Sequence, residues 1–172
     1  GAGGNLPASV PELMLSYINQ LNRTIEPANQ QDYLQVQQDA QRVAWECLKQ
    51  TYRPTTATKV DILSALVGEQ GDRNAQMRLA YLEKRLQLVQ TLEPGNKIRF
   101  ILDPLAEYLA ALNLVTQNRD KSEIYWQQFF NSIDTVLEDT NDPPEAIQGF
   151  LLAVRDCCIL QRKEALVPEQ LI

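Results

Sequence analysis

The residue types that usually carry enzyme chemistry are sparse in this chain. It contains no histidine, so it lacks the base of a Ser-His-Asp or Cys-His nucleophile system. It also contains no G-x-x-x-x-G-K-[S/T] run, which a phosphate-binding loop requires. Glu138, Asp139 and Asp142 could serve as paired carboxylates for acid–base work, but helix ends and loops collect such charges anyway. We therefore expect no catalytic residue and no cofactor in this chain.

The three cysteines, Cys47, Cys157 and Cys158, show neither disulfide nor zinc-ligand spacing. We expect them to pack in the core and to bind no metal. An odd number of cysteines is typical of a reducing compartment, and no apolar run approaches the roughly 20 residues that cross a membrane. The sequence thus predicts a cytoplasmic protein without membrane contact. Its opening glycine is typical of an expression remnant, so we expect a fragment of a longer protein.

Basic residues are concentrated in one stretch of an acidic chain. The 172 residues carry a net charge of −6, yet the stretch from residue 73 to 99 holds six basic residues against two acidic ones. The six are Arg73, Arg78, Lys84, Arg85, Lys97 and Arg99. They could form a nucleic-acid interface or a solvated, domain-docking face. The net negative charge favours the second interpretation, because phosphate contacts need a net basic face.

The elements that position these residues are predicted to be a helix, a β-hairpin and a second helix between residues 74 and 115. A helical stripe begins the stretch and consists of Ala75, Leu79, Leu82 and Leu86. Alternation then predicts two strands, with Leu88, Gln90 and Leu92 on one side of the first and Ile98, Phe100 and Leu102 on the buried side of the second. The Pro-Gly-Asn run at 94–96 allows the chain to reverse. Asp103 is expected to cap the second helix, with Pro104 at its first position.

The rest of the chain is predicted to be helical, which gives a mainly α fold. Residues 1–53 form an N-terminal helical segment with helices near 11–25 and 29–52. Residues 54–117 have the helix–helix–hairpin order of a winged-helix module, and its first short helix is capped by Thr58.

Residues 118–172 are predicted to form antiparallel helices that could make a HEAT-like pair. Ser122 and Asp142 are the expected caps of these helices. The first helix has an aromatic stripe, made of Trp126, Phe129, Phe130, Ile133 and Leu137, which is typical of core packing.

Residues 98–111, IRFILDPLAEYLAA, resemble the signature that closes the winged-helix domain of NACHT-type NTPases, signal-transduction ATPases of the STAND class. Residues 81–89 are similar to the helix and strand that lead into the wing in that family. Residues 144–158 resemble the helical region of bacterial, especially cyanobacterial, members.

The resemblance implies a non-catalytic regulatory region that docks on an upstream nucleotide-binding domain, where the parent protein would bind ATP or ADP. It places the docking contacts at Leu102, Asp103, Glu107 and Tyr108. Many members carry a nucleotide-contacting histidine where Leu102 stands, so the resemblance does not carry that contact over to this chain. The alternatives are a winged-helix DNA-binding regulator and a helical scaffold. A scaffold would bind a protein partner through the glutamine-rich helix at 29–52 or through the aromatic helix.

Overall fold

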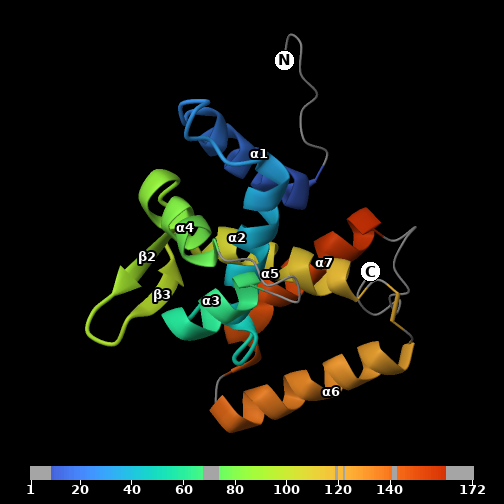
Figure 1. Cartoon of the computed structure of the whole chain (residues 1–172). Coiled ribbons are helices and arrows are strands. Elements are labelled where there is room, and N and C mark those ends of the chain that lie inside the picture. The colour runs from blue at the N-terminus through green and yellow to red at the C-terminus, as the bar shows by residue number, and fades with distance from the viewer. Residues whose placement is uncertain (1–8, 68–73, 119, 122, 141–142, 162–172) are drawn as a thin grey trace.

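The computed structural model describes residues 9–67, 74–118, 120–121, 123–140 and 143–161. Seven α-helices and a small antiparallel sheet occupy these ranges, so the predicted mainly α fold with a hairpin is confirmed (Figure 1). The elements in chain order are α1 (Val10–Arg23), α2 (Tyr33–Leu48), β1 (Ala57–Thr58), α3 (Lys59–Val67), α4 (Ala75–Ala80), the π-helix η2 (Tyr81–Arg85), β2 (Val89–Leu92), β3 (Lys97–Phe100), α5 (Asp103–Gln117), α6 (Glu123–Thr140), the 3₁₀-helix η3 (Pro144–Ile147) and α7 (Gln148–Gln161). The predicted caps Ser122 and Asp142 lie outside the described residues.

Helix α2 is shorter at both ends than the predicted range 29–52. It begins after Asp32, whose side chain accepts a hydrogen bond from the backbone N–H of Gln35 at 3.2 Å. It ends at Leu48, and the following turn takes Tyr52 to a φ of 56°. Local capping and turn formation therefore set these ends, although the apolar pattern continues past both of them.

The sheet has three strands, in the order β1-β3-β2, and the sequence predicted only two of them. Strand β1 pairs Ala57 with Ile98 and Thr58 with Lys97. Thr58 also caps α3 as predicted, because its hydroxyl accepts a hydrogen bond from the N–H of Asp61 at 3.1 Å. Two residues are too few to show alternation in a sequence, so this strand had no detectable pattern.

The hairpin turns where the sequence indicated, with Gly95 at a φ of 107° that favours glycine. Val89 pairs with Phe100 on the buried face of the sheet, while Gln90 is exposed. Ile98 and Phe100 are buried as predicted. Leu102 is not, because the strand ends at Phe100 and leaves the Leu102 side chain 49% exposed.

The predicted single α-helix over 74–86 changes type in its middle. Helix α4 ends at Ala80, and η2 follows with an N–H to C=O bond of 3.1 Å from Leu86 to Tyr81, five residues back. This wider turn buries both Tyr81 and Leu82. The Tyr81 hydroxyl donates to the side chain of Asn22 and accepts from the N–H of Gln31 at 3.3 Å, which ties η2 to the last turn of α1 and to the α1–α2 loop.

One hydrophobic core runs through all three segments that the sequence suggested. Helix α5 packs on α2 and on α7, and α1 lies against the same three helices (Figure 1). Ile18, Val43, Leu109 and Phe150 are fully buried together in this core. The boundaries at residues 53 and 117 therefore do not separate independent cores. The HEAT-like arrangement of the last two helices stays a prediction.

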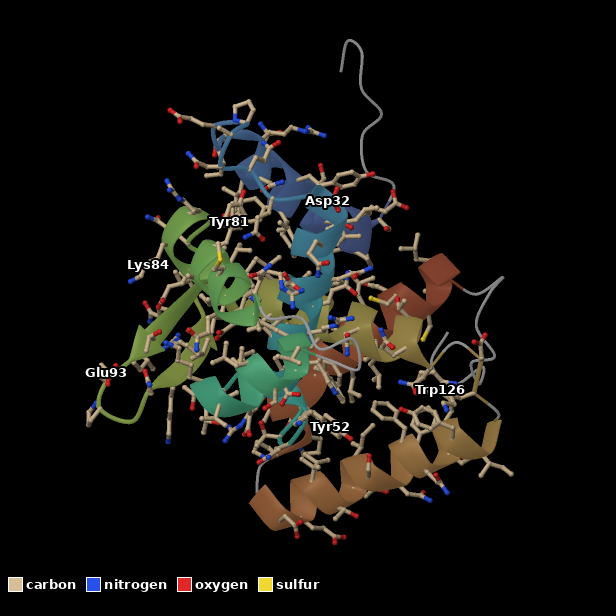
Figure 2. The ribbon with its side chains drawn as sticks, viewed as in Figure 1. Asp32, Tyr52, Tyr81, Lys84, Glu93 and Trp126 are labelled. Carbon is tan, nitrogen blue, oxygen red and sulfur yellow. The ribbon has the colours of Figure 1, made fainter. Side chains whose placement is uncertain are left out.

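Helix α6 stands apart from the other helices in the ribbon, and aromatic side chains fill the space between (Figures 1 and 2). The Tyr52 ring stacks on Phe150 with centroids 5.5 Å apart and contacts Phe129 at 5.6 Å. Its hydroxyl forms a 2.7 Å hydrogen bond with Ser132. Trp126 is fully buried, so the expectation that the aromatic stripe packs in the core is confirmed.

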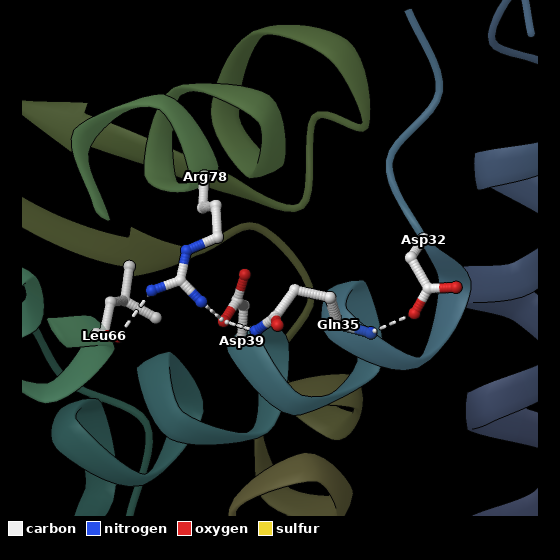
Figure 3. Close-up of polar contacts among 5 residues, drawn as sticks. All are labelled: Asp32, Gln35, Asp39, Leu66 and Arg78. Carbon is white, nitrogen blue, oxygen red and sulfur yellow. Dashed lines mark hydrogen bonds and ion pairs between the residues drawn. The ribbon is translucent and has the colours of Figure 1, made fainter. Parts of the chain in front are cut away.

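A buried ion pair joins α4 to α2 (Figure 3). Arg78 Nη1 donates to Asp39 Oδ1 at 2.9 Å, and Arg78 Nη2 donates to the carbonyl oxygen of Leu66 on α3. Gln35 Nε2 donates to the same carboxylate at 2.9 Å. The side chains of Arg78 and Asp39 are only 8% and 1% exposed, so this is a pairing of two buried charges.

Replacing Arg78 with methionine should lower the free energy of unfolding by about 3–5 kcal/mol, because it breaks a buried ion pair by removing one of the two charges. Urea unfolding followed by circular dichroism measures this loss. Lys84→Met is the matched control, since exposed Lys84 should tolerate the change within about 0.5 kcal/mol. Equal stability of the two variants would contradict the structural role of the pair.

Candidate interaction surface at the strand-to-helix junction

The junction between β3 and α5 exposes two large apolar side chains. Ile101 is 43% and Leu102 49% exposed, and Asp103 beside them is exposed as well. The Ile101 N–H is held by the carbonyl of Leu88 at 3.0 Å, and the Leu102 carbonyl accepts from the N–H of Ala106 at 3.1 Å. This last bond starts α5, so Leu102 is the N-cap and the predicted cap at Asp103 is wrong by one residue. Asp103 lies in the first helical turn, where the helix dipole favours a negative charge.

Glu107 and Tyr108, the other two residues of the predicted docking set, contact α7. The Tyr108 hydroxyl donates to Asp156 Oδ2 at 2.6 Å. The Glu107 carboxylate lies against Gly149, in space that a β-carbon at that position would occupy. The structure therefore divides the set into an outward pair, Leu102 and Asp103, and an inward pair that joins α5 to α7.

The inward pair is electrostatically perturbed. Burial raises the pKa of the Glu107 carboxyl above its ordinary value, and the nearby charge of Asp103 raises it further. Burial also raises the pKa of the Tyr108 hydroxyl, with smaller contributions from its hydrogen bond to Asp156 and the charge of that carboxylate. Tyr108 thus stays protonated and acts as a hydrogen-bond donor at neutral pH.

A cavity of about 130 Å³ opens beside the outward pair. Its lining residues are Cys47, Pro54, Thr55, Thr56, Arg99, Phe100, Asp103 and Ala106. Thr55 Oγ1 donates to the Cys47 carbonyl at 2.7 Å, and burial raises the pKa of the Cys47 thiol to about 12, so this side of the cavity is uncharged. The charged lining residues are Arg99 and Asp103. Sequence reasoning missed Thr55 and Thr56, because only the pairing of β1 with β3 brings them here.

The predicted basic face is only partly exposed. Lys84, Arg85, Lys97 and Arg99 are all exposed on η2 and β3, and Figure 2 shows Lys84 pointing away from the protein body. Arg78 does not belong to this face, because its guanidinium is buried against Asp39. Arg73 lies outside the described residues.

Other features bear on the expected absence of metal and membrane contacts. The described residues contain no group of three or more His, Cys, Asp or Glu side chains that could hold a metal ion. All three cysteines are buried free thiols, as the sequence predicted for core packing, and burial raises the pKa of Cys157 and of Cys158. In the described part of the chain, no helix is both long and apolar enough to span a membrane.

These features define a mainly helical module with a small antiparallel sheet and an exposed strand-to-helix junction. Residues 139–172 match the family model described as NACHT C-terminal helical domain 4. No curated protein and no solved structure gives a significant match. The described part of the matched region contains η3, α7 and the end of α6. The match supports a NACHT-class helical region at this end of the chain.

Glu107→Gln should make the protein more stable at neutral pH, with little difference at about pH 4. The pKa of Glu107 is raised on folding, so the stability it contributes is present below its unfolded pKa and is lost as the pH rises through the folded pKa. Glutamine keeps the shape of the Glu107 side chain but cannot ionise, so the stability no longer falls as the pH rises. Urea unfolding of both proteins across the pH range measures the effect, with exposed Glu138→Gln as the control. A stability difference between Glu107→Gln and the wild type that does not vary with pH would contradict the raised pKa of Glu107.

Proposed function

We propose that this chain is the winged-helix and helical regulatory region of a bacterial STAND/NACHT-type signalling NTPase. Its role is to dock on the nucleotide-binding domain of the parent protein, which would carry the P-loop and bind ATP or ADP in the cytoplasm. The match of residues 139–172 to a NACHT helical domain supports the class. The observation that carries the docking role is the exposed apolar pair Ile101 and Leu102 beside Asp103.

The winged-helix assignment is supported by the order of the elements. Helix α2, strand β1, helices α3 and α4, and the β2–β3 hairpin follow one another and share one core. The proposed module keeps its predicted range of 54–117, and α2 supports it by packing on α3 and α5. The proposed docking edge at Leu102 lies where its last strand meets α5.

The proposed mechanism is a two-state switch. In one nucleotide state the junction packs on the nucleotide-binding domain, and in the other it separates, so the nucleotide biases a bistable interface. Because Tyr108 and Glu107 fasten α5 to α7, the junction and α7 move together as one body. The small cavity beside Asp103 offers space for a side chain from the opposing domain.

Leu102→Asp should weaken docking by tenfold or more, since it places a charge in an interface that buries an apolar side chain. Calorimetric titration of this chain with the separately expressed nucleotide-binding domain, with ADP and with ATP, measures the affinity. Leu152→Asp is the matched control, because Leu152 on α7 is 44% exposed and lies away from the junction. No affinity in either nucleotide state, or an equal loss in both variants, would reject the docking role.

A second candidate function, binding of duplex DNA, rests on the exposure of Lys84, Arg85, Lys97 and Arg99. Duplex binding requires an affinity that falls steeply with salt concentration. The slope of log affinity against log salt concentration should become shallower by about one for each phosphate contact removed, as in Arg85→Ala or Lys97→Ala. Arg78→Ala cannot test it, because that side chain holds the core together. An absence of duplex binding at about 50 mM salt would eliminate this candidate.

A further inference from the structure

An apolar groove runs between α6 and α7, on a part of the molecule that the proposed docking edge does not use. It is open to solvent, has a volume of about 490 Å³ and is lined by Phe130, Ile133, Asp134, Gln148, Leu151, Leu152 and Arg155. Phe130, Leu151 and Leu152 keep part of their apolar surface accessible, and Leu152 is 44% exposed. The α7 residues span two helical turns, or about 10 Å along the helix axis.

The two sides of the groove carry opposite charge. The charged residues of α6 are all acidic, and two of them, Asp134 and Glu138, lie four residues apart on one exposed helix face. On α7, Arg155 is 53% exposed and lies 4.0 Å from Asp156, whose other oxygen accepts the Tyr108 hydroxyl. An occupant of this groove would therefore meet the Asp134 carboxylate on one flank, with Glu138 one turn further along α6, and the Arg155 guanidinium on the other.

We propose that the groove binds an amphipathic α-helix of a partner protein, with an apolar stripe on the groove floor and lysine or arginine residues along the flank that faces α6. A helix suits this site because an apolar floor between two helices accepts side chains at i, i+3, i+4 and i+7. The acidic side of the groove determines the charge of the facing flank. This inference goes beyond the proposed function, since its partner is not the nucleotide-binding domain.

The walls of the groove are held in place from behind. Tyr52 contacts Phe129 of α6 and Phe150 of α7 and hydrogen-bonds to Ser132, so it fixes the spacing of the two helices. On its other side, α7 is joined to α5 through Tyr108 and Asp156. A groove with rigid walls loses little conformational freedom when it binds a ligand, which favours affinity.

The test uses two fluorescein-labelled synthetic peptides of about 18 residues, or five helical turns, with the same leucine stripe. One carries lysines along one flank, and the other carries glutamates at the same positions. Fluorescence anisotropy at about 150 mM salt should show that the full chain binds the lysine peptide at least tenfold more tightly. Leu152→Asp should weaken its binding by about tenfold, because it places a charge on the apolar floor.

Charge reversal distinguishes the groove from the overall charge of the chain. Asp134→Lys/Glu138→Lys should reverse the preference, so that the glutamate peptide binds more tightly. Glu26→Lys/Glu93→Lys makes the same change of net charge at two exposed residues in the α1–α2 loop and the β2–β3 turn, and it should leave the preference for the lysine peptide intact. Thermal melts by circular dichroism confirm that each variant is folded. Equal binding of the two peptides to the wild-type chain would overturn the proposal. An equal change of peptide preference in the two double variants would overturn it as well.

Discussion

The buried contact between Arg78 and Asp39 is the constraint on which the placement of the sheet and the junction depends. Removing two charges from water costs several kcal/mol each, and only close pairing with further hydrogen bonds compensates for it. Here Gln35 and the Leu66 carbonyl supply those bonds, so α4 has one favourable position against α2 and α3. The π-helix, the hairpin and the start of α5 follow directly along the chain. The buried contact between Arg78 and Asp39 therefore helps to set the position of the exposed junction.

Periodicity identified the parts of the fold whose burial repeats along the chain, and it missed those that depend on a distant partner. The stripe that includes Trp126 and Phe129 was predictable, because its spacing alone indicates a helix with one buried face. The burial of Arg78 was not, since its local sequence resembles a basic surface and its partner lies on α2. The same holds for β1, whose two residues become a strand only by pairing with β3.

The candidate site shows the same limit. The resemblance predicted a stretch of docking contacts, but a resemblance along the chain cannot tell which side chains of a helix face a neighbouring helix. The structure turns Glu107 and Tyr108 toward α7 and leaves Leu102 and Asp103 outward. The fold thereby presents two separate surfaces, one at the junction and one between α6 and α7. Helix α7 lines the second surface and contacts α5 behind the first through Asp156 and Gly149. The two proposed interactions, with a nucleotide-binding domain and with a partner helix, would therefore not compete for the same surface.

The most direct measurement is hydroxyl-radical footprinting of this chain in the presence and absence of the nucleotide-binding domain that the proposed function assigns to its parent protein. The account predicts that oxidation of Ile101 and Leu102 falls on binding, in one nucleotide state more than in the other. Met77 on α4 is 68% exposed and Leu152 on α7 is 44% exposed, and both should be oxidised equally in the two samples. Protection of Met77 or Leu152 with no change at the junction would contradict the account, because the contact would then lie on α4 or on the groove.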